Sequence, residues 1–116
     1  MAITYIDTER CPRTKLAGAQ GTAAQIVNRD LCGAKNTIGM LRWLEAGERF
    51  DVEPLSGKHQ LIYLMEGNGI ISLGAQNYEV PKGSGIYLGP RESSSIKQAG
   101  LLPLKLLHLI VSQSFD

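Results

Sequence analysis

The sequence of 116 residues has no surplus of charge of either sign and no long apolar run. It carries 12 basic and 11 acidic side chains, for a formal net charge of +1. Nucleic acids and anionic membranes attract proteins whose basic side chains gather on one face, and this balance disfavours both partners. No apolar run approaches the roughly 20 residues that span a bilayer, and residues 1–10 lack the basic-then-apolar order of a signal peptide. We therefore expect a soluble, cytoplasmic protein.

Cysteine is scarce, and the two cysteines match no zinc-binding spacing. Thiols in cytosolic proteins normally stay reduced, so Cys11 and Cys32 are predicted to be free and structural. A chain of this size buries roughly two-thirds of its unfolded surface, which is adequate for one core without disulfides.

Several catalytic signatures are also missing from the chain. There is no phosphate-binding loop of the Gly-x-x-x-x-Gly-Lys type, no nucleophile elbow, no His-Glu-x-x-His helix and no CxxC pair. The segment from Gly67 to Gly69 is too short to be a dinucleotide-binding fingerprint. These absences leave phosphoryl transfer, serine hydrolysis and zinc proteolysis without support.

Glycine, in contrast, is abundant: 13 of 116 residues, and it recurs as turn punctuation through the second half of the chain. Short apolar or alternating segments lie between these turns. The predicted strands are 23–27, 38–44, 49–53, 59–65, 70–73, 78–80, 85–88, 93–98 and 104–111, with a loop over 30–36.

Eight or nine short strands with turns every 8–12 residues are typical of an antiparallel sandwich or barrel. A parallel α/β fold is disfavoured because no amphipathic helix of 10–15 residues separates the strands. We expect one all-β domain over residues 1–116, in which residues 1–35 form an N-terminal arm that packs on the barrel or on a partner subunit.

The strand at 59–65 has two apolar faces. Period-two alternation puts Gln60, Ile62 and Leu64 on one face, and His59, Leu61, Tyr63 and Met65 on the other. A second subunit is a natural cover for the outer face, so a homodimer is predicted. After this strand, residues 66–69 (Glu-Gly-Asn-Gly) supply glycines able to take positive φ, and a tight antiparallel hairpin is predicted there.

Three segments together resemble the conserved barrel of the cupin superfamily. Residues 44–48 (Leu-Glu-Ala-Gly-Glu) match the usual entry to its first motif, and residues 60–69 resemble the stretch in which an acidic ligand precedes apolar alternation and a Gly-x-Gly turn. Residues 78–90 resemble the second motif, with its glycine turn, apolar strand and proline. The resemblance implies a double-stranded β-helix, or jelly-roll, barrel of the RmlC-like type.

The resemblance also shows where the usual metal ligands of the family are missing. The glutamate slot falls on Gln60, and the last histidine slot falls on Ser94 or Ser95. The first two histidine slots fall at Glu53 and Leu55, or at Pro54 and Ser56 with the alternative spacing. Only two histidines, His59 and His108, exist in the chain, so the three-histidine site cannot be assembled in one subunit. We expect no metal and no cofactor; an atypical site would have to recruit His59, His108 or Glu53.

The candidate ligand-binding residues are Gln60, Arg42, Tyr87, Ser94 and Ser95. A buried amide at Gln60 needs partners, which a substrate or an internal polar network would each supply. Arg42 at the barrel mouth would bind a substrate carboxylate through paired N–H donors, whereas the plain alternative is an outward arginine beside a core tryptophan. The serines would form a hydrogen-bonding wall, and Tyr87 would present its hydroxyl.

The functional prediction is a cupin-like protein that binds a small organic metabolite in the barrel mouth, with the possibility of a metal-independent isomerase or cyclase activity left open. Acid–base roles would then fall to Glu53, His59 or Tyr87. The alternatives are a non-catalytic ligand- or protein-binding module and a metal-dependent cupin with atypical ligands. The fold alone does not choose among them.

Overall fold

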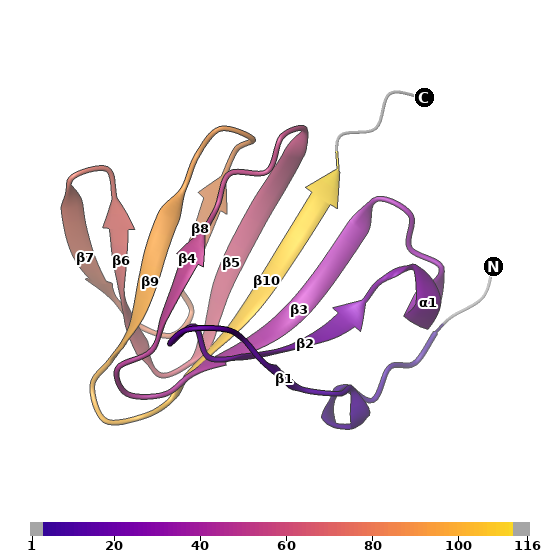
Figure 1. The fold of residues 1–116 in the computed structure, drawn as a ribbon, viewed down its shortest axis with the longest axis horizontal. Coiled ribbons are helices and arrows are strands. Elements are labelled where there is room, and N and C mark those ends of the chain that lie inside the picture. Colours follow the sequence, from indigo (N-terminus) through magenta and orange to yellow (C-terminus); the bar gives the residue numbers. More distant parts are fainter. Residues whose placement is uncertain (1–3, 113–116) are drawn as a thin grey trace.

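The computed structural model describes residues 4–112, which form two facing β-sheets (Figure 1). The larger sheet has six strands in the order β1-β2-β3-β10-β5-β8, and the smaller has four in the order β4-β9-β6-β7. All paired strands are antiparallel. The predicted all-β architecture is confirmed.

The strands of the larger sheet are β1 (Thr14–Lys15), β2 (Thr22–Val27), β3 (Thr37–Leu44), β5 (Lys58–Glu66), β8 (Gly85–Leu88) and β10 (Leu104–Ser112). Those of the smaller sheet are β4 (Arg49–Val52), β6 (Asn68–Leu73), β7 (Gln76–Val80) and β9 (Ser94–Ala99). The two helical turns are η1 (Thr8–Arg10) and α1 (Arg29–Cys32). Within residues 4–112, no helix is long and apolar enough to cross a membrane.

The loop predicted over 30–36 is wrong in its first part, because α1 occupies Arg29–Cys32. Its start is capped by Asn28, whose Oδ1 accepts the Leu31 amide proton at 2.8 Å, and Gly33 ends it with a left-handed φ of +74°. Four residues are too few to show a helical period, so only this pair of caps marks the helix in the sequence.

The tight hairpin predicted at residues 66–69 is also wrong. The strands on its two sides, β5 and β6, belong to different sheets: β5 pairs with β10 and β8, and β6 pairs with β7 and β9. Gly67 has a φ of +80°, and a Cβ built on it would lie 2.5 Å from the carbonyl oxygen of Pro103. The glycine is needed where the chain crosses between the sheets and passes close to the segment before β10.

The core lies between the sheets and follows the alternation of the strands. On β5, Gln60, Ile62 and Leu64 are buried, whereas Leu61 and Tyr63 are about two-fifths exposed. The two faces predicted for this strand are therefore confirmed. The core cluster consists of Leu44, Phe50, Val52, Ile62, Leu64, Ile71, Ile86, Leu88, Ile96, Leu104 and Leu106.

The segment between β1 and β2 closes one side of the smaller sheet. The backbone N–H of Arg49 donates to the Ala19 carbonyl at 2.7 Å, and that of Asp51 donates to Oε1 of Gln20 at 3.2 Å. Since β4 is the edge strand of its sheet, these bonds occupy N–H groups that would otherwise be unpaired. They also fix the N-terminal arm against the barrel.

Candidate functional site

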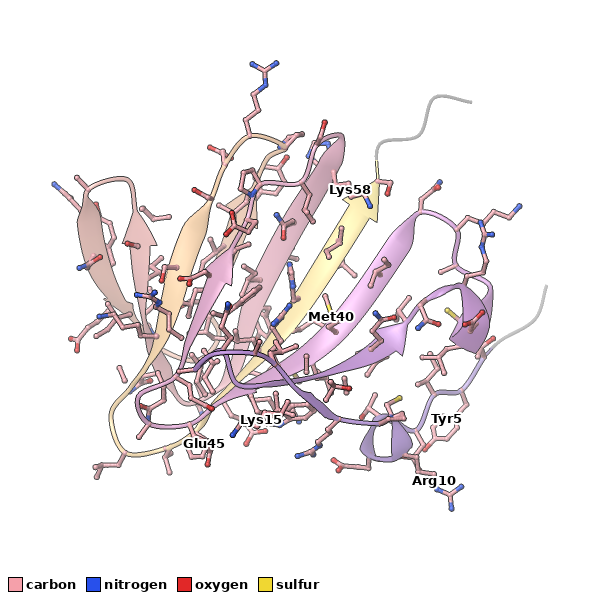
Figure 2. The ribbon with its side chains drawn as sticks, in the orientation of Figure 1. Tyr5, Arg10, Lys15, Met40, Glu45 and Lys58 are labelled. Carbon is pink, nitrogen blue, oxygen red and sulfur yellow. The ribbon has the colours of Figure 1, made fainter. Side chains whose placement is uncertain are left out.

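A cavity lies against β2 and β3 of the larger sheet. Its floor is the inner face of β2 and β3, where Ala23 is paired with Arg42 and Gln25 with Met40. The opposite wall is supplied by residues 5–16, the part of the N-terminal arm that precedes β2; Figure 2 shows Tyr5 and Arg10 on this part and Met40 on β3. The cavity has a volume of about 780 Å³, within the range of small-molecule sites.

Arg42 is the charged residue of the cavity floor. Its guanidinium carbon lies 3.7 Å from the centroid of the Phe50 ring, which belongs to the facing sheet. Arg42 forms no ion pair with any residue between 4 and 112, and its Nε is buried without a hydrogen-bond partner among them. Burial lowers the pKa of Arg42 to about 10, and the side chain remains a cation at neutral pH. The inner end of the cavity thus carries a cation without a carboxylate partner.

Near Arg42, the buried side chains of Gln60 and His108 are hydrogen-bonded to each other. Nε2 of Gln60 donates to the Glu53 carbonyl at 2.9 Å, which orients the amide so that Oε1 faces Nε2 of His108 at 2.7 Å. His108 is therefore protonated on Nε2, and its Nδ1 is left as an acceptor with no partner among the described residues. A substrate and an internal polar network were the two predicted sources of hydrogen-bond partners for Gln60, and the structure contains the internal network.

The ring of His108 packs at 5.1 Å from the ring of Phe50, the same ring that contacts Arg42. Burial and the positive charge of Arg42 both lower the pKa of His108, to about 4. The histidine is thus neutral at neutral pH, and it cannot supply a second positive charge to the cavity.

The predicted ligand-binding serines, Ser94 and Ser95, lie outside the Arg42 cavity. Ser94 and Ser95 line a separate groove of about 360 Å³ together with Ser72, Asp51 and Glu53. The Ser94 hydroxyl donates to the Ser72 carbonyl at 2.6 Å. The groove is built on β4, β6 and β9 and shares no lining residue with the Arg42 cavity, so the serines do not form a wall of that cavity.

Tyr87 lies on the opposite face of the larger sheet. It is 60% exposed, its hydroxyl is hydrogen-bonded to Nδ1 of His59, and the two rings stack with centroids 5.8 Å apart. The structure thus brings Arg42 and His108 to the same Phe50 ring, with Gln60 hydrogen-bonded to His108, and leaves the serines and Tyr87 outside the Arg42 cavity. Through its bond to the Glu53 carbonyl, Gln60 also contacts a residue that lines the serine groove.

The residues in the usual metal-ligand slots of the cupin motifs do not fit a divalent metal. Gln60 is a neutral amide bonded to protein groups, Ser94 is bonded to the backbone, and Glu53 is exposed. In the part of the chain from 4 to 112, no three His, Cys, Asp or Glu side chains gather. Transition metals favour imidazole and carboxylate, whereas these slots contain no imidazole and a single, exposed carboxylate, that of Glu53.

The sequence did not reveal the arm as a wall of the cavity. Ile6, Cys11 and Leu16 line the cavity, but they follow no strand or helix period. Met40 could have been found, because it lies two residues from Arg42 on one strand and therefore on the same face. The opposing Phe50 gives no local signal, since its contact with Arg42 depends on how the sheets face each other.

Comparison with known proteins gives little by sequence. No family model matches the chain. An uncharacterized protein of Methanocaldococcus jannaschii is 38% identical over 48 residues, which make up 41% of this chain. The match spans only 38% of that relative's length.

Comparison by structure is more informative. A predicted oxalate decarboxylase from Thermotoga maritima matches with a TM-score of 0.82 at 16% identity, over 95% of this chain and all of the other. The polyketide cyclase RemF of Streptomyces resistomycificus matches at 0.76 and 12% identity, over 99% and 88%. An RmlC-like cupin from Shewanella frigidimarina matches at 0.73 and 11% identity, over 99% and 96%. The chain thus has the cupin fold, the RmlC-like jelly roll that its motifs resemble.

Proposed function

We propose that the protein binds a small organic molecule in the cavity between its N-terminal arm and the inner face of β2 and β3. The observation that carries this proposal is the cavity itself, which is mostly apolar and contains a cation, Arg42, that forms no ion pair within residues 4–112. Such a combination of apolar walls and few polar groups is typical of ligand sites. Two of the proteins with the same fold are named as a predicted oxalate decarboxylase and a polyketide cyclase, and both names refer to small organic compounds.

A thermal-shift screen of small organic metabolites tests the proposal, because a ligand that binds only the native state raises the unfolding temperature. Ala23→Phe should fill the cavity and abolish the shift given by each true ligand. Ser95→Leu, which changes the serine groove, should leave the shift intact. Hits that survive Ala23→Phe but are lost in Ser95→Leu would move the site to the groove, and no hit at all would contradict the proposal.

We also propose that the outer face of the larger sheet pairs two copies into a homodimer. Leu61, Tyr63 and Met65 on β5, Tyr87 on β8 and Val111 on β10 are each between 37% and 60% exposed, and they share this face. Apolar side chains gathered in this way are typical of protein interfaces. The two-fold symmetric pairing of identical faces would remove them from water.

Light scattering should therefore give a mass of about twice 12.6 kDa at micromolar concentration. Leu61→Lys should give a monomer, because it puts a charge into the apolar face that the dimer would bury. Leu73→Lys is the matched control: Leu73 is equally exposed, at 43% against 40%, but lies on the smaller sheet. A wild-type monomer, or dissociation by Leu73→Lys alone, would contradict this assembly.

A further inference from the structure

The geometry points to the chemical class of the ligand: we infer that the cavity takes a monocarboxylate with an apolar body, its carboxylate on Arg42 and its body against the N-terminal arm. This inference rests on the proposed function, since it presupposes that the cavity binds a small molecule. It goes further by naming the chemical group of the ligand that lies at the inner end of the cavity and the residue that selects this group.

The first step is the state of Arg42. Its Nε–H is buried and without an acceptor in the described part of the chain, and its guanidinium lies against the Phe50 ring. A buried polar donor without a partner is costly, and a buried cation more so. The ring face offsets part of this cost. An incoming carboxylate at the exposed part of the guanidinium would supply the missing countercharge.

The second step is the distribution of charge along the cavity. The other charged lining residues, Asp7, Arg10 and Asp30, are exposed and lie at the rim. The side chain of Arg10 is 88% exposed and is within 3.8 Å of the Asp7 carboxylate. Among the lining residues that the structure describes, the cation at the rim lies beside a carboxylate and the cation at the inner end does not, so the ligand's anionic group is directed inward.

The third step excludes a doubly charged phosphate. One guanidinium balances one negative charge, and His108 behind the Phe50 ring is neutral and does not line the cavity. Sites for phosphate groups usually combine a cation with further donors, such as a helix N-terminus or a second basic side chain. No second basic side chain accompanies Arg42 among the inward-facing lining residues that the structure describes.

The fourth step is the apolar body. Between Arg42 and the rim, the lining side chains are mainly uncharged and carbon-rich: Ile6, Cys11, Pro12, Leu16, Ala23 and Met40. Water held against such a surface is displaced favourably by an apolar group. A short hydrophilic acid would leave this surface wet, and we expect it to bind more weakly than an aryl or alkyl acid.

The test compares matched acid and amide probes on the wild-type protein by calorimetry and ligand-observed NMR. The pairs are phenylacetate with phenylacetamide and octanoate with octanamide, which differ in charge but hardly in shape. We expect each acid to bind at least tenfold more tightly than its amide, because hydrogen bonds to charged groups exceed neutral ones by about this factor. Inorganic phosphate and acetate should bind more weakly than either aryl or alkyl acid.

Two arginines of the same cavity provide matched variants. Arg42→Gln should remove the preference for acid over amide, so that the two probes of each pair bind with affinities within about twofold of each other. Arg10→Gln, at the rim, should keep the preference. Circular dichroism checks that each variant is folded, and the wild-type comparison remains decisive if Arg42→Gln does not fold. Equal binding of acid and amide would overturn the inference alone, whereas failure of every probe and of the metabolite screen would overturn the proposed function with it.

Discussion

Gly67→Ala is expected to lower the free energy of unfolding by about 2–5 kcal/mol. Two effects combine at this corner between the sheets. The left-handed backbone, with φ of +80°, costs an L-residue about 1–2 kcal/mol. The added methyl group would also lie 2.5 Å from the Pro103 carbonyl oxygen and 3.2 Å from the Leu104 Cα, both backbone atoms. Making room for a group in a packed site costs about 1–3 kcal/mol more.

Gly83→Ala separates these two effects. Gly83 has a φ of +90°, but a Cβ built on it meets no atom within 4 Å. This variant should therefore lose only the backbone contribution, about 1–2 kcal/mol. Urea unfolding of the wild type and both variants measures the difference through the transition midpoints. Equal losses of stability at the two positions would mean that the backbone before β10 shifts to accommodate the methyl group. The close approach of Gly67 to the Pro103 carbonyl would then not constrain residue 67.

Acidification from pH 7 to pH 4.5 is expected to cost the native state about 2–3 kcal/mol through His108 alone. Burial and Arg42 lower the pKa of this histidine from 6.5 to about 4, so in this range the unfolded chain binds a proton that the folded chain does not. Stability therefore falls as the pH drops below 6.5, and the loss levels off below about 4. At pH 6.5 the contribution of His108 to the pH dependence is half its maximum, and it fades within about one pH unit above that.

The comparison with His108→Phe isolates this contribution, since the carboxylates of the protein titrate in both. The variant should be less stable at pH 7, because Oε1 of Gln60 loses its donor, but its stability should fall less steeply on acidification. Urea unfolding at pH 7 and 4.5 gives both slopes. A direct NMR titration of the His108 ring in the wild type covers the case in which the variant does not fold. Parallel slopes, or an ordinary pKa for the ring, would contradict the prediction.

The strands of this protein could be predicted from its sequence because most of them alternate or end at glycines. The segment 85–88 was predicted with its observed bounds, and the others within a few residues. The two-residue strand β1 could not be found, since it is too short to alternate. A glycine between two strands does not indicate whether those strands pair with each other. Gly74 lies between β6 and β7, which pair as a hairpin, whereas Gly67 lies between strands of different sheets.

The candidate site was harder to predict, because its contacts join distant parts of the chain. Gln60 and His108 are hydrogen-bonded although 48 residues separate them. Arg42 was singled out because a charged residue interrupts an apolar strand. Its neighbour Phe50 and the wall formed by the arm depend on how the sheets face each other. Ser94 and Ser95 come shortly after the second cupin-like motif, residues 78–90, and occupy its histidine slot. The groove that they line is nevertheless separate from the Arg42 cavity.

The position of β10 between β3 and β5 has a consequence for how the protein reaches its native state. The strand formed by Leu104–Ser112 is near the end of the chain, yet it is a central strand of the larger sheet. Its pairing of Val111 with Thr37 joins residues 74 positions apart. Such long-range pairing slows folding. While the chain is being synthesised, β3 and β5 lack their shared partner, and their apolar faces and open edges are available to other proteins, including chaperones.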